Sequence, residues 1–296
     1  MDNQAELAEH FDRSRTHLRA VAYRMLGSAD EADDAIQEAW LRACRADAGA
    51  VANMMGWLST IVGRVCLDML RSRRRRREEF ADLSELDLVV AHDTPDPANE
   101  AVLADSVGLA LLVVLDTLGP AERIAFVLHD LFAVPFAEIA EIVERSPATA
   151  KKLASRARHR VHGTGTAAAI DLVEQREVVD AFLAASRSGD LARLLELLAP
   201  DVVRRADSLA LSGDGRTELR GARLVAEETA SNIRLARFAR PVLVNGNIGA
   251  VVAPLGRLAL VLGFVVHGDR IAEINVIGDP VHLRQLELAV VDPPSS

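Results

Sequence analysis

The most distinctive chemistry in the sequence lies in a short basic segment, residues 147–162. On a helical wheel at about 100° per residue, its apolar and polar residues separate onto two arcs. The apolar arc comprises Ala150, Leu153, Ala154, Ala157 and Val161. The other arc carries five bases and no acid: Lys151, Lys152, Ser155, Arg156, Arg158, His159 and Arg160. This composition suits a major groove lined by phosphate, so we predict a DNA-contacting helix in preference to a solvated charged one.

The residues before this segment predict that it is the second helix of a helix-turn-helix. Phe136–Val143 has helical spacing, Glu144–Arg145 would form the turn, and Ser146-Pro147 would start the next helix. Serine at the N-cap followed by proline at the first helical position is a strong start signal. Two short helices joined by a tight turn form the common DNA-reading motif.

A second basic patch consists of Arg64 and the six arginines within Arg71–Arg77. Arginine forks onto phosphate and guanine better than lysine does. A basic tail that only aids solubility is the alternative interpretation. Residues 78–100 follow at once with eight acids, no base and two prolines, which predicts an acidic linker.

Three helices are expected before that linker, within residues 10–77. The first ends at Gly27, and Ser28–Glu31 is a capping box that starts the second. The second helix has a small apolar stripe: Ala32, Ala35, Ile36, Ala39 and Ala43. The third is expected to bury Leu58, Ile61, Val62, Val65 and Met69. Two further helices should flank Gly119-Pro120.

The last third of the chain changes character. Helices are expected near 171–187, 190–198 and 221–236, followed by strands at 241–245, 248–254, 257–267 and 270–277. This order predicts an α+β domain with a curved antiparallel sheet. Asp207, His267 and Glu273 are candidates for an acid–base pair in its pocket, but such residues more often have structural roles. The chain carries no phosphate-binding loop, nucleophile elbow or metal-spaced histidine cluster, so we expect no enzyme and no cofactor or metal.

Composition limits the possible partners and location. The net charge is −9, and both halves of the chain are mildly acidic, so weak binding to DNA by the chain alone is expected. Cys44 and Cys66 lack partners with metal-binding or disulfide spacing. The longest apolar run, residues 258–266, is too short to span a membrane, and no secretory signal opens the chain. We expect a cytoplasmic protein without membrane contact.

Three segments together resemble the extracytoplasmic-function (ECF) sigma factors of bacterial RNA polymerase. LRAVAYRMLGSADEADDAIQEAWLRAC, residues 18–44, looks like their clamp-binding helices. GWLSTIVGRVCLDMLRSRRRR, residues 56–76, resembles the helix that melts and reads the −10 element. The −35-reading domain is similar to LGPAERIAFVLHDLFAVPFAEIAEIVERSPATAKKLASRARHRV, residues 118–161.

The resemblance implies roles for the matched positions. The surface that meets the β′ clamp would comprise Asp33, Asp34, Gln37, Glu38 and Trp40. The −10 element would meet Arg64, Asp68, Arg71, Arg73 and Arg74, with Val65 where the family usually has asparagine. The −35 element would meet Thr149, Lys151, Lys152, Ser155, Arg156 and Arg158. Core RNA polymerase, through its β′ clamp and β flap, and promoter DNA are the implied partners.

A second resemblance lies in residues 178–203, which look like the opening of a SnoaL-like cone domain. Some ECF sigma factors carry such an extension in place of a separate anti-sigma factor, which implies that none is required here. Their Trp-Leu-Pro-Glu-Pro motif is absent from the linker between Phe80 and Glu100. Their Asp-Gly-Gly-Gly loop has an approximate counterpart in residues 212–216, which makes Asp214, Gly215 and Arg216 a candidate regulatory loop.

The expected fold is therefore multidomain: two all-α domains that bind polymerase and DNA, the second a helix-turn-helix, followed by an α+β SnoaL-like domain. The expected ranges are 8–77, a linker at 78–100, then 101–163 and 170–290. The implied function is promoter-specific transcription initiation regulated by the C-terminal domain. The alternative is a one-component helix-turn-helix regulator whose C-terminal domain binds a ligand or catalyses a reaction.

Overall fold

The computed structural model describes residues 2–46, 51, 53–79, 108–163, 169–210 and 216–291. The chain divides into two compact units. The first contains Met1–Val107 and Leu118–Arg158, and the second contains Gly108–Thr117 and His159–Ser296. None of the described helices is both long and apolar enough to cross a membrane.

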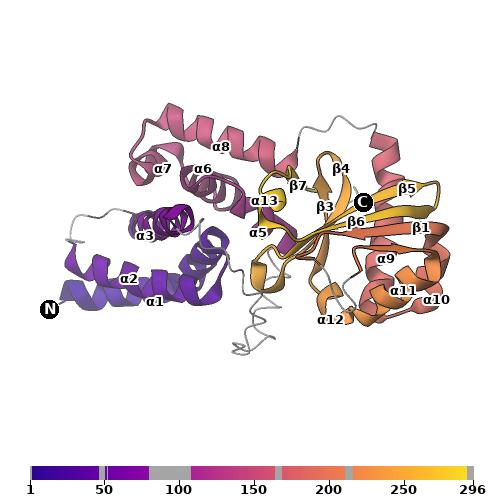
Figure 1. Ribbon diagram of the computed structural model, residues 1–296. Helices are drawn as coiled ribbons and strands as arrows, with labels where there is room; N and C mark the ends of the chain where they lie inside the picture. The colour runs from indigo at the N-terminus through magenta and orange to yellow at the C-terminus, as the bar shows by residue number, and fades with distance from the viewer. Residues whose placement is uncertain are drawn as a thin grey trace. The chain divides into compact units, whose positions relative to one another are not determined.

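The first unit opens with three packed helices, α1 (Asp2–Leu26), α2 (Ala29–Arg45) and α3 (Met54–Glu79) (Figure 1). Gly27 ends α1 with φ of 75°, a left-handed conformation that glycine adopts without strain. Ser28 then caps α2, and its hydroxyl accepts a hydrogen bond from the Glu31 amide at 3.4 Å. The predicted boundary between these helices is confirmed.

The expected apolar stripes hold for α2 and need one correction for α3. All five stripe residues predicted for α2 are buried. On α3, Leu58, Val62 and Val65 are buried, but Ile61 and Met69 are only half-buried. The difference arises because α3 also packs against two later helices of this unit, α6 (Pro120–Phe126) and α7 (Phe136–Val143). Its buried surface is therefore wider than one stripe, and it also covers Ser59, Gly63, Cys66, Leu67 and Leu70.

The helix-turn-helix forms as predicted. A π-helical turn, η1 (Val127–Leu131), separates α6 from α7, and α8 (Pro147–His162) follows. Glu144 makes the turn in the left-handed conformation, with φ of 55°. Ser146 caps α8, with its hydroxyl oxygen 3.2 Å from the Thr149 amide nitrogen. The five residues predicted for the apolar arc of α8 are all buried.

The second unit is built on a seven-stranded sheet, ordered β2-β1-β6-β5-β4-β3-β7. Its strands are β1 (Leu198–Ala206), β2 (Glu218–Arg220), β3 (Ala239–Val244), β4 (Asn247–Val252), β5 (Leu260–His267), β6 (Arg270–Ile277) and β7 (Leu288–Val290). The middle strands form the predicted meander, in which β5 pairs with β6 from Val261 opposite Ile277.

Two expectations about this sheet are corrected. Three strands, β1, β2 and β7, lie outside the predicted set, and two of them are only three residues long, too short for a period-two pattern. The sheet is also not wholly antiparallel, because β1 pairs with β6 in parallel. The intervening helices and strands carry the chain back to the same end of the sheet, which permits parallel pairing.

Helices cover one face of the sheet and enclose the core of this unit (Figure 1). They are α9 (Ala169–Ser188), α10 (Leu191–Leu197) and α11 (Ala222–Ser231), while α12 (Ile233–Ala236) packs against α9. Phe182 of α9 packs edge-on against Phe264 of β5, with ring centroids 5.5 Å apart. A short turn, η2 (Pro254–Gly256), follows β4, and α13 (Pro280–Leu283) precedes β7.

Helix α5 (Leu109–Asp116) belongs to this second unit. It is the helix expected before Gly119-Pro120, and it packs against β3, β7 and η2. Its buried residues are Leu109, Leu112, Val113, Val114 and Leu115. The predicted range 101–163 placed this helix with the helix-turn-helix, whereas its packing groups it with the sheet.

Candidate nucleic-acid interface

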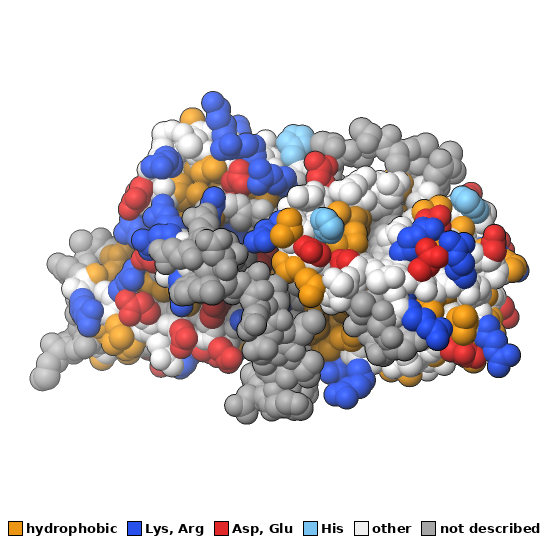
Figure 2. Space-filling view, viewed as in Figure 1, with side chains coloured by type: hydrophobic (Ala, Val, Ile, Leu, Met, Phe, Trp, Pro, Cys, Tyr) orange, Lys and Arg blue, Asp and Glu red, His pale blue; other side chains and the backbone are white. Residues whose placement is uncertain are grey.

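The outer face of α8 presents the predicted basic arc to solvent. All seven residues of that arc are exposed. Figure 2 shows Lys and Arg side chains along the ridge that α8 occupies in Figure 1. The buried apolar arc fixes the rotation of the helix, so the bases face outward together. This surface has the charge and shape that a major groove requires.

Two of these arginines are held by acids of their own unit. Arg158 lies 2.6 Å from the carboxylate of Asp130 on η1, and Arg156 lies 3.7 Å from Glu122 on α6. The arginine ends of these pairs are exposed, at 46% and 64%, whereas the acids are largely covered, at 20% and 12%. Both pairs orient the guanidinium groups without removing them from the surface.

Thr149 has a different setting from the other residues predicted to face the −35 element. It is half-buried, and its hydroxyl oxygen lies 2.9 Å from that of the capping residue Ser146. Its contact with the cap places it at the N-terminus of α8. The N-terminal residues of a recognition helix are those that usually reach base edges.

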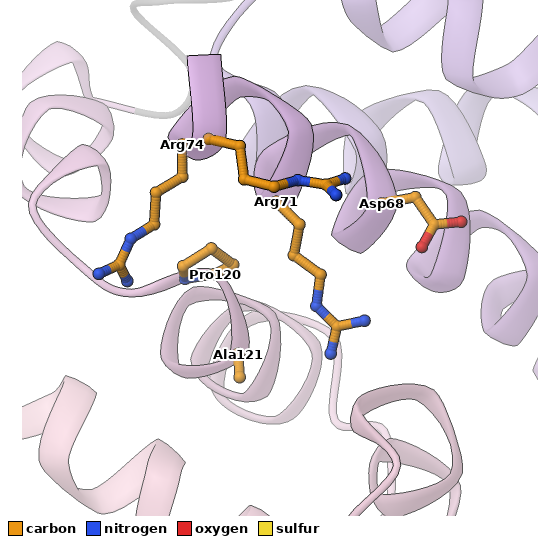
Figure 3. Close-up of a pocket in the computed structure, with 6 residues that line it drawn as sticks. Asp68, Arg71, Arg74, Pro120 and Ala121 are labelled. Carbon is orange, nitrogen blue, oxygen red and sulfur yellow. The ribbon is translucent and has the colours of Figure 1, made fainter. Parts of the chain in front are cut away.

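The arginines near the end of α3 line a cleft of about 750 Å³ within the first unit. Arg71, Arg74 and Arg75 of α3 and Pro120 of α6 contribute to its walls. In Figure 3, Arg71 and Arg74 extend from α3 beside the start of α6. Arg64, two turns earlier on α3, is also exposed. These side chains form a cationic surface able to hold phosphate groups.

Arg73 does not share that surface, although it stands in the same run. Its guanidinium donates to the Leu26 carbonyl at the end of α1, at 3.2 and 3.3 Å, and forms an ion pair with Glu31 of α2. A cation at a helix C-terminus is favoured by the helix dipole. Arg73 therefore joins α1, α2 and α3, and in this structure it serves packing.

Asp68 is likewise tied to a neighbouring helix. Arg42 of α2 bonds Glu38 at 2.8 Å and Asp68 at 3.1 Å. The hydrogen bond to Glu38, together with Asp68, raises the pKa of Arg42 above its usual value. This triad joins the predicted clamp-binding face of α2 to the predicted −10 helix.

The remaining predicted clamp residues lie along α2. Asp34 and Gln37 are exposed. Asp33 accepts two hydrogen bonds from Arg19, at 2.6 and 3.0 Å, and that guanidinium holds the pKa of Asp33 below its ordinary value. Trp40 packs against Phe11 with ring centroids 4.9 Å apart. The exposed positions of this face thus carry the carboxylates of Asp33 and Asp34 and the amide of Gln37, and an aromatic pair anchors it.

Sequence reasoning missed Arg123 of α6. Its side chain is 2% exposed, and Nη2 donates to the Arg24 carbonyl near the end of α1 at 3.4 Å. It also helps surround Cys66, a thiol whose pKa burial raises to about 12. The only available sequence indication was a single arginine directly before the apolar residues Ile124–Leu128, which is a weak pattern.

Two of the three candidate acid–base residues of the C-terminal domain, Asp207 and Glu273, have structural contacts. Asp207 accepts hydrogen bonds from four backbone amides, those of Leu209, Ala210, Gly278 and Asp279. Burial opposes its ionisation, but these amides hold its pKa below the ordinary value. Glu273 pairs with Arg205 at 3.0 Å, and His267 is exposed where β5 ends. No metal-binding group of three His, Cys, Asp or Glu occurs among the described residues.

The candidate regulatory loop falls mostly outside the described residues. Asp214 and Gly215 lie there, so their placement remains a prediction. Arg216 is exposed, and its carbonyl accepts a hydrogen bond from the buried Arg204 at 3.0 Å. Arg204 in turn forms an ion pair with Glu228 of α11. The C-terminal end of the loop is thereby fastened to β1 and α11.

Comparison with known proteins identifies the two helical modules. Residues 10–76 match the family model for Sigma-70 region 2, and residues 108–161 match that for Sigma-70, region 4. The ECF RNA polymerase sigma factor SigJ of Mycobacterium tuberculosis is 39% identical over 277 residues, which cover 90% of this chain and 86% of SigJ. The chain belongs to the ECF sigma factors.

Two further comparisons cover nearly the whole length of this ECF sigma factor. The probable ECF sigma factor SigI of M. tuberculosis is 35% identical, over 92% of this chain and 93% of SigI. The crystal structure of SigJ aligns with 93% of this chain and 97% of its own, at 30% identity and a TM-score of 0.44. Proteins of this family are initiation factors that bind core RNA polymerase and promoter DNA, and they are not enzymes. The C-terminal domain of this chain is a mixed α+β fold, in which helices and a seven-stranded sheet enclose one core.

Proposed function

We propose that this ECF sigma factor reads the −35 element with α8 and is regulated by its own C-terminal domain. The exposed basic face of α8 carries the first part of the proposal. We assign −35 contacts to Thr149, Lys151, Lys152, Ser155, Arg156 and Arg158. Lysine and arginine side chains reach both phosphates and guanine edges from a helix in the major groove.

The −10 element is assigned to the exposed part of α3. Arg64, Arg71 and Arg74 are exposed there, and Asp68 lies between them. Arg73 acts in this proposal by holding α3 against α1 and α2, because its guanidinium is already bound at the end of α1. Because Arg73 joins α3 to α1 and α2, the orientation of α3 would be fixed while its exposed arginines contact DNA.

Polymerase binding is assigned to α2. Asp33, Asp34, Gln37, Glu38 and Trp40 would face the β′ clamp, and the region-4 module would meet the β flap. An acidic face fits a basic partner surface, and such complementarity favours fast and specific association. The place of action is then the cytoplasm, where the core enzyme works.

The packing of the first unit supports regulation by rearrangement. Arg64 on α3 donates to the Glu141 carbonyl on α7 at 3.5 Å, and Gly63 fits so closely that an added methyl would lie 3.0 Å from Ile142. The names of the −10 and −35 elements place them about 25 base pairs apart, which is about 85 Å at a rise of 3.4 Å per base pair of B-DNA. Helix α8 is only about 24 Å long at 1.5 Å per residue. A unit in which α3 touches α7 must therefore open to read both elements together.

We assign control of this opening to the C-terminal domain, so that a separate anti-sigma factor is not required. Its core of buried residues from α9–α11 and the sheet is that of an independent fold rather than a tail. A short connection to α8 keeps it at high effective concentration beside the DNA-reading modules. The sigma factor RpoE of Bartonella quintana, by contrast, was crystallised with the anti-sigma factor NepR.

Transcription in vitro tests the proposal. Core polymerase with the full chain should transcribe a cognate promoter, and a chain ending at Gly163 should change that rate several-fold while still binding core enzyme. Equal transcription by both chains would exclude regulation by the C-terminal domain. Tight, sequence-specific DNA binding by the full chain without core polymerase would contradict the polymerase-dependent mechanism.

A further inference from the structure

Helix α5 has an apolar surface that the C-terminal sheet covers. Five of its eight residues are buried, and its packing partners in the second unit are β3, β7 and η2. A helix that is apolar around most of its circumference is stable in water only when other elements cover it. The sheet therefore provides cover that α5 needs.

The same edge of the sheet also receives the chain where α8 ends. Gly163 adopts φ of +70°, and a methyl added there would lie 3.1 Å from the Ala289 side chain of β7 and 3.6 Å from Leu243 of β3. Ala289 and Leu243 are paired across these two strands. The segments immediately before and after the helix-turn-helix thus both meet the β3–β7 edge.

The family model counts α5 within region 4, since its match begins at residue 108. The packing instead assigns α5 to the C-terminal domain. We propose that the β3–β7 edge is a docking surface for α5, and that this docking is the contact through which the C-terminal domain controls region 4. This inference rests on the regulatory role proposed above.

The position of α5 in the chain gives the contact its consequence. While α5 is docked, residues 80–108 join α3 to a fixed helix. When α5 is released and unwound, residues 80–119 join α3 to α6. Eight residues that pass from helix to extended chain lengthen this connection by about 15 Å. Docking of α5 therefore shortens the longest reach of this connection by about 15 Å.

The two edges of the sheet provide a matched experiment in the full chain. Leu288 of β7 and Leu219 of β2 are both buried, at 5% and 8% exposure, and both lie in three-residue strands at opposite ends of the sheet. Leu288→Asp should speed amide hydrogen exchange of residues 109–117 by about tenfold or more, because local opening exposes those amides. Leu219→Asp should leave that peptide as protected as in the unsubstituted chain.

Circular dichroism and the exchange of α9 establish whether each variant is folded. If Leu288→Asp is unfolded, Leu288→Ala provides the milder comparison with Leu219→Ala. Unchanged protection of residues 109–117 in a folded Leu288 variant overturns the docking proposal, as does equal loss of protection in both variants. Hydrogen exchange is measured without transcription, so its result is independent of the truncation experiment. If truncation changes transcription but the Leu288 substitutions do not change the exchange of α5, the C-terminal domain regulates transcription through another contact.

Discussion

Arg158 on α8 donates from both Nε and Nη2 to a single carboxylate oxygen of Asp130 on η1, at 2.9 and 2.6 Å. In the free protein, Asp130 therefore accepts the hydrogen bonds of the guanidinium group that we assign to DNA. The arginine side chain remains 46% exposed, so a phosphate or a guanine edge can reach it. This arrangement sets an internal competitor against the promoter.

Removing that competitor should strengthen promoter binding. Asp130→Asn removes a negative charge beside the DNA-facing surface, so holoenzyme should bind a −35-containing promoter more tightly. Arg158→Ala should weaken binding by about 1–3 kcal/mol if Arg158 contacts a base. Gel-shift titration measures both effects. The gain from Asp130→Asn should shrink strongly in the Arg158→Ala background, and an undiminished gain would show that Asp130 acts through general repulsion.

Lys151 and Lys152 should contribute mainly through phosphate. The double change to alanine should lower holoenzyme affinity for promoter and non-promoter DNA alike. The slope of log affinity against log salt should fall by about one for each phosphate that is no longer neutralised. Arg223→Ala on α11 is the control, since Arg223 is an exposed arginine of the C-terminal domain. Identical slopes for the double variant and the unsubstituted protein would remove these lysines from the interface.

Arg71 and Arg73 should separate binding from stability. Arg73→Ala removes hydrogen bonds to the end of α1 and the ion pair with Glu31, so the free energy of unfolding should fall by about 1–3 kcal/mol. Arg71→Ala, at an exposed site, should leave unfolding unchanged and reduce promoter opening. Urea titration and permanganate footprinting distinguish the two. Should Arg73→Ala prove as stable as Arg71→Ala, the structural role assigned to Arg73 is wrong.

Asp207 predicts an acid-sensitive C-terminal domain. Its pKa is lowered in the folded state by four backbone amides, against the effect of burial. The stability that it contributes is therefore complete above the unfolded pKa of about 3.9 and is lost as pH falls through the lower folded value. Asp207→Asn should be less stable at neutral pH and show a flatter stability curve below pH of about 4. Urea unfolding across pH measures this, and parallel curves for the two proteins would contradict it.

Asp34 tests the clamp assignment. It is exposed on α2, so Asp34→Arg should leave the fold intact while reversing a charge at the proposed interface. Pull-down with core polymerase should recover several-fold less of this variant. Asp201→Arg, an exposed acid on β1, should be recovered like the unsubstituted chain. Equal recovery of both variants would place the clamp contact elsewhere on α2.

Local patterns were sufficient to predict the boundary between α1 and α2 and the second helix of the helix-turn-helix, α8. The capping hydrogen bonds of Gly27, Ser28 and Ser146 join each residue to another within four positions of it, so the local sequence is enough to predict them. The apolar arc of α8 follows from a period of 3.6 residues and dictates which side chains are exposed. The ECF sigma factor resemblance rests on the same local strings, and the relatives confirm it.

Only the tertiary structure decided how residues distant in sequence share their contacts. Three arginine contacts depend on which helices meet: the hydrogen bonds of Arg73 to the end of α1, the burial of Arg123 and the pairing of Arg158 with Asp130. The arginines of one run, such as residues 71–77, cannot be told apart from the sequence. The short strands β2 and β7 carry too few residues for a periodic pattern and exist because neighbouring strands supply their hydrogen bonds. The sequence of helix α5 shows only that the helix is apolar. The hydrophobic effect is non-directional, so the sequence does not say which element covers α5, and only the packed structure shows that it is the sheet.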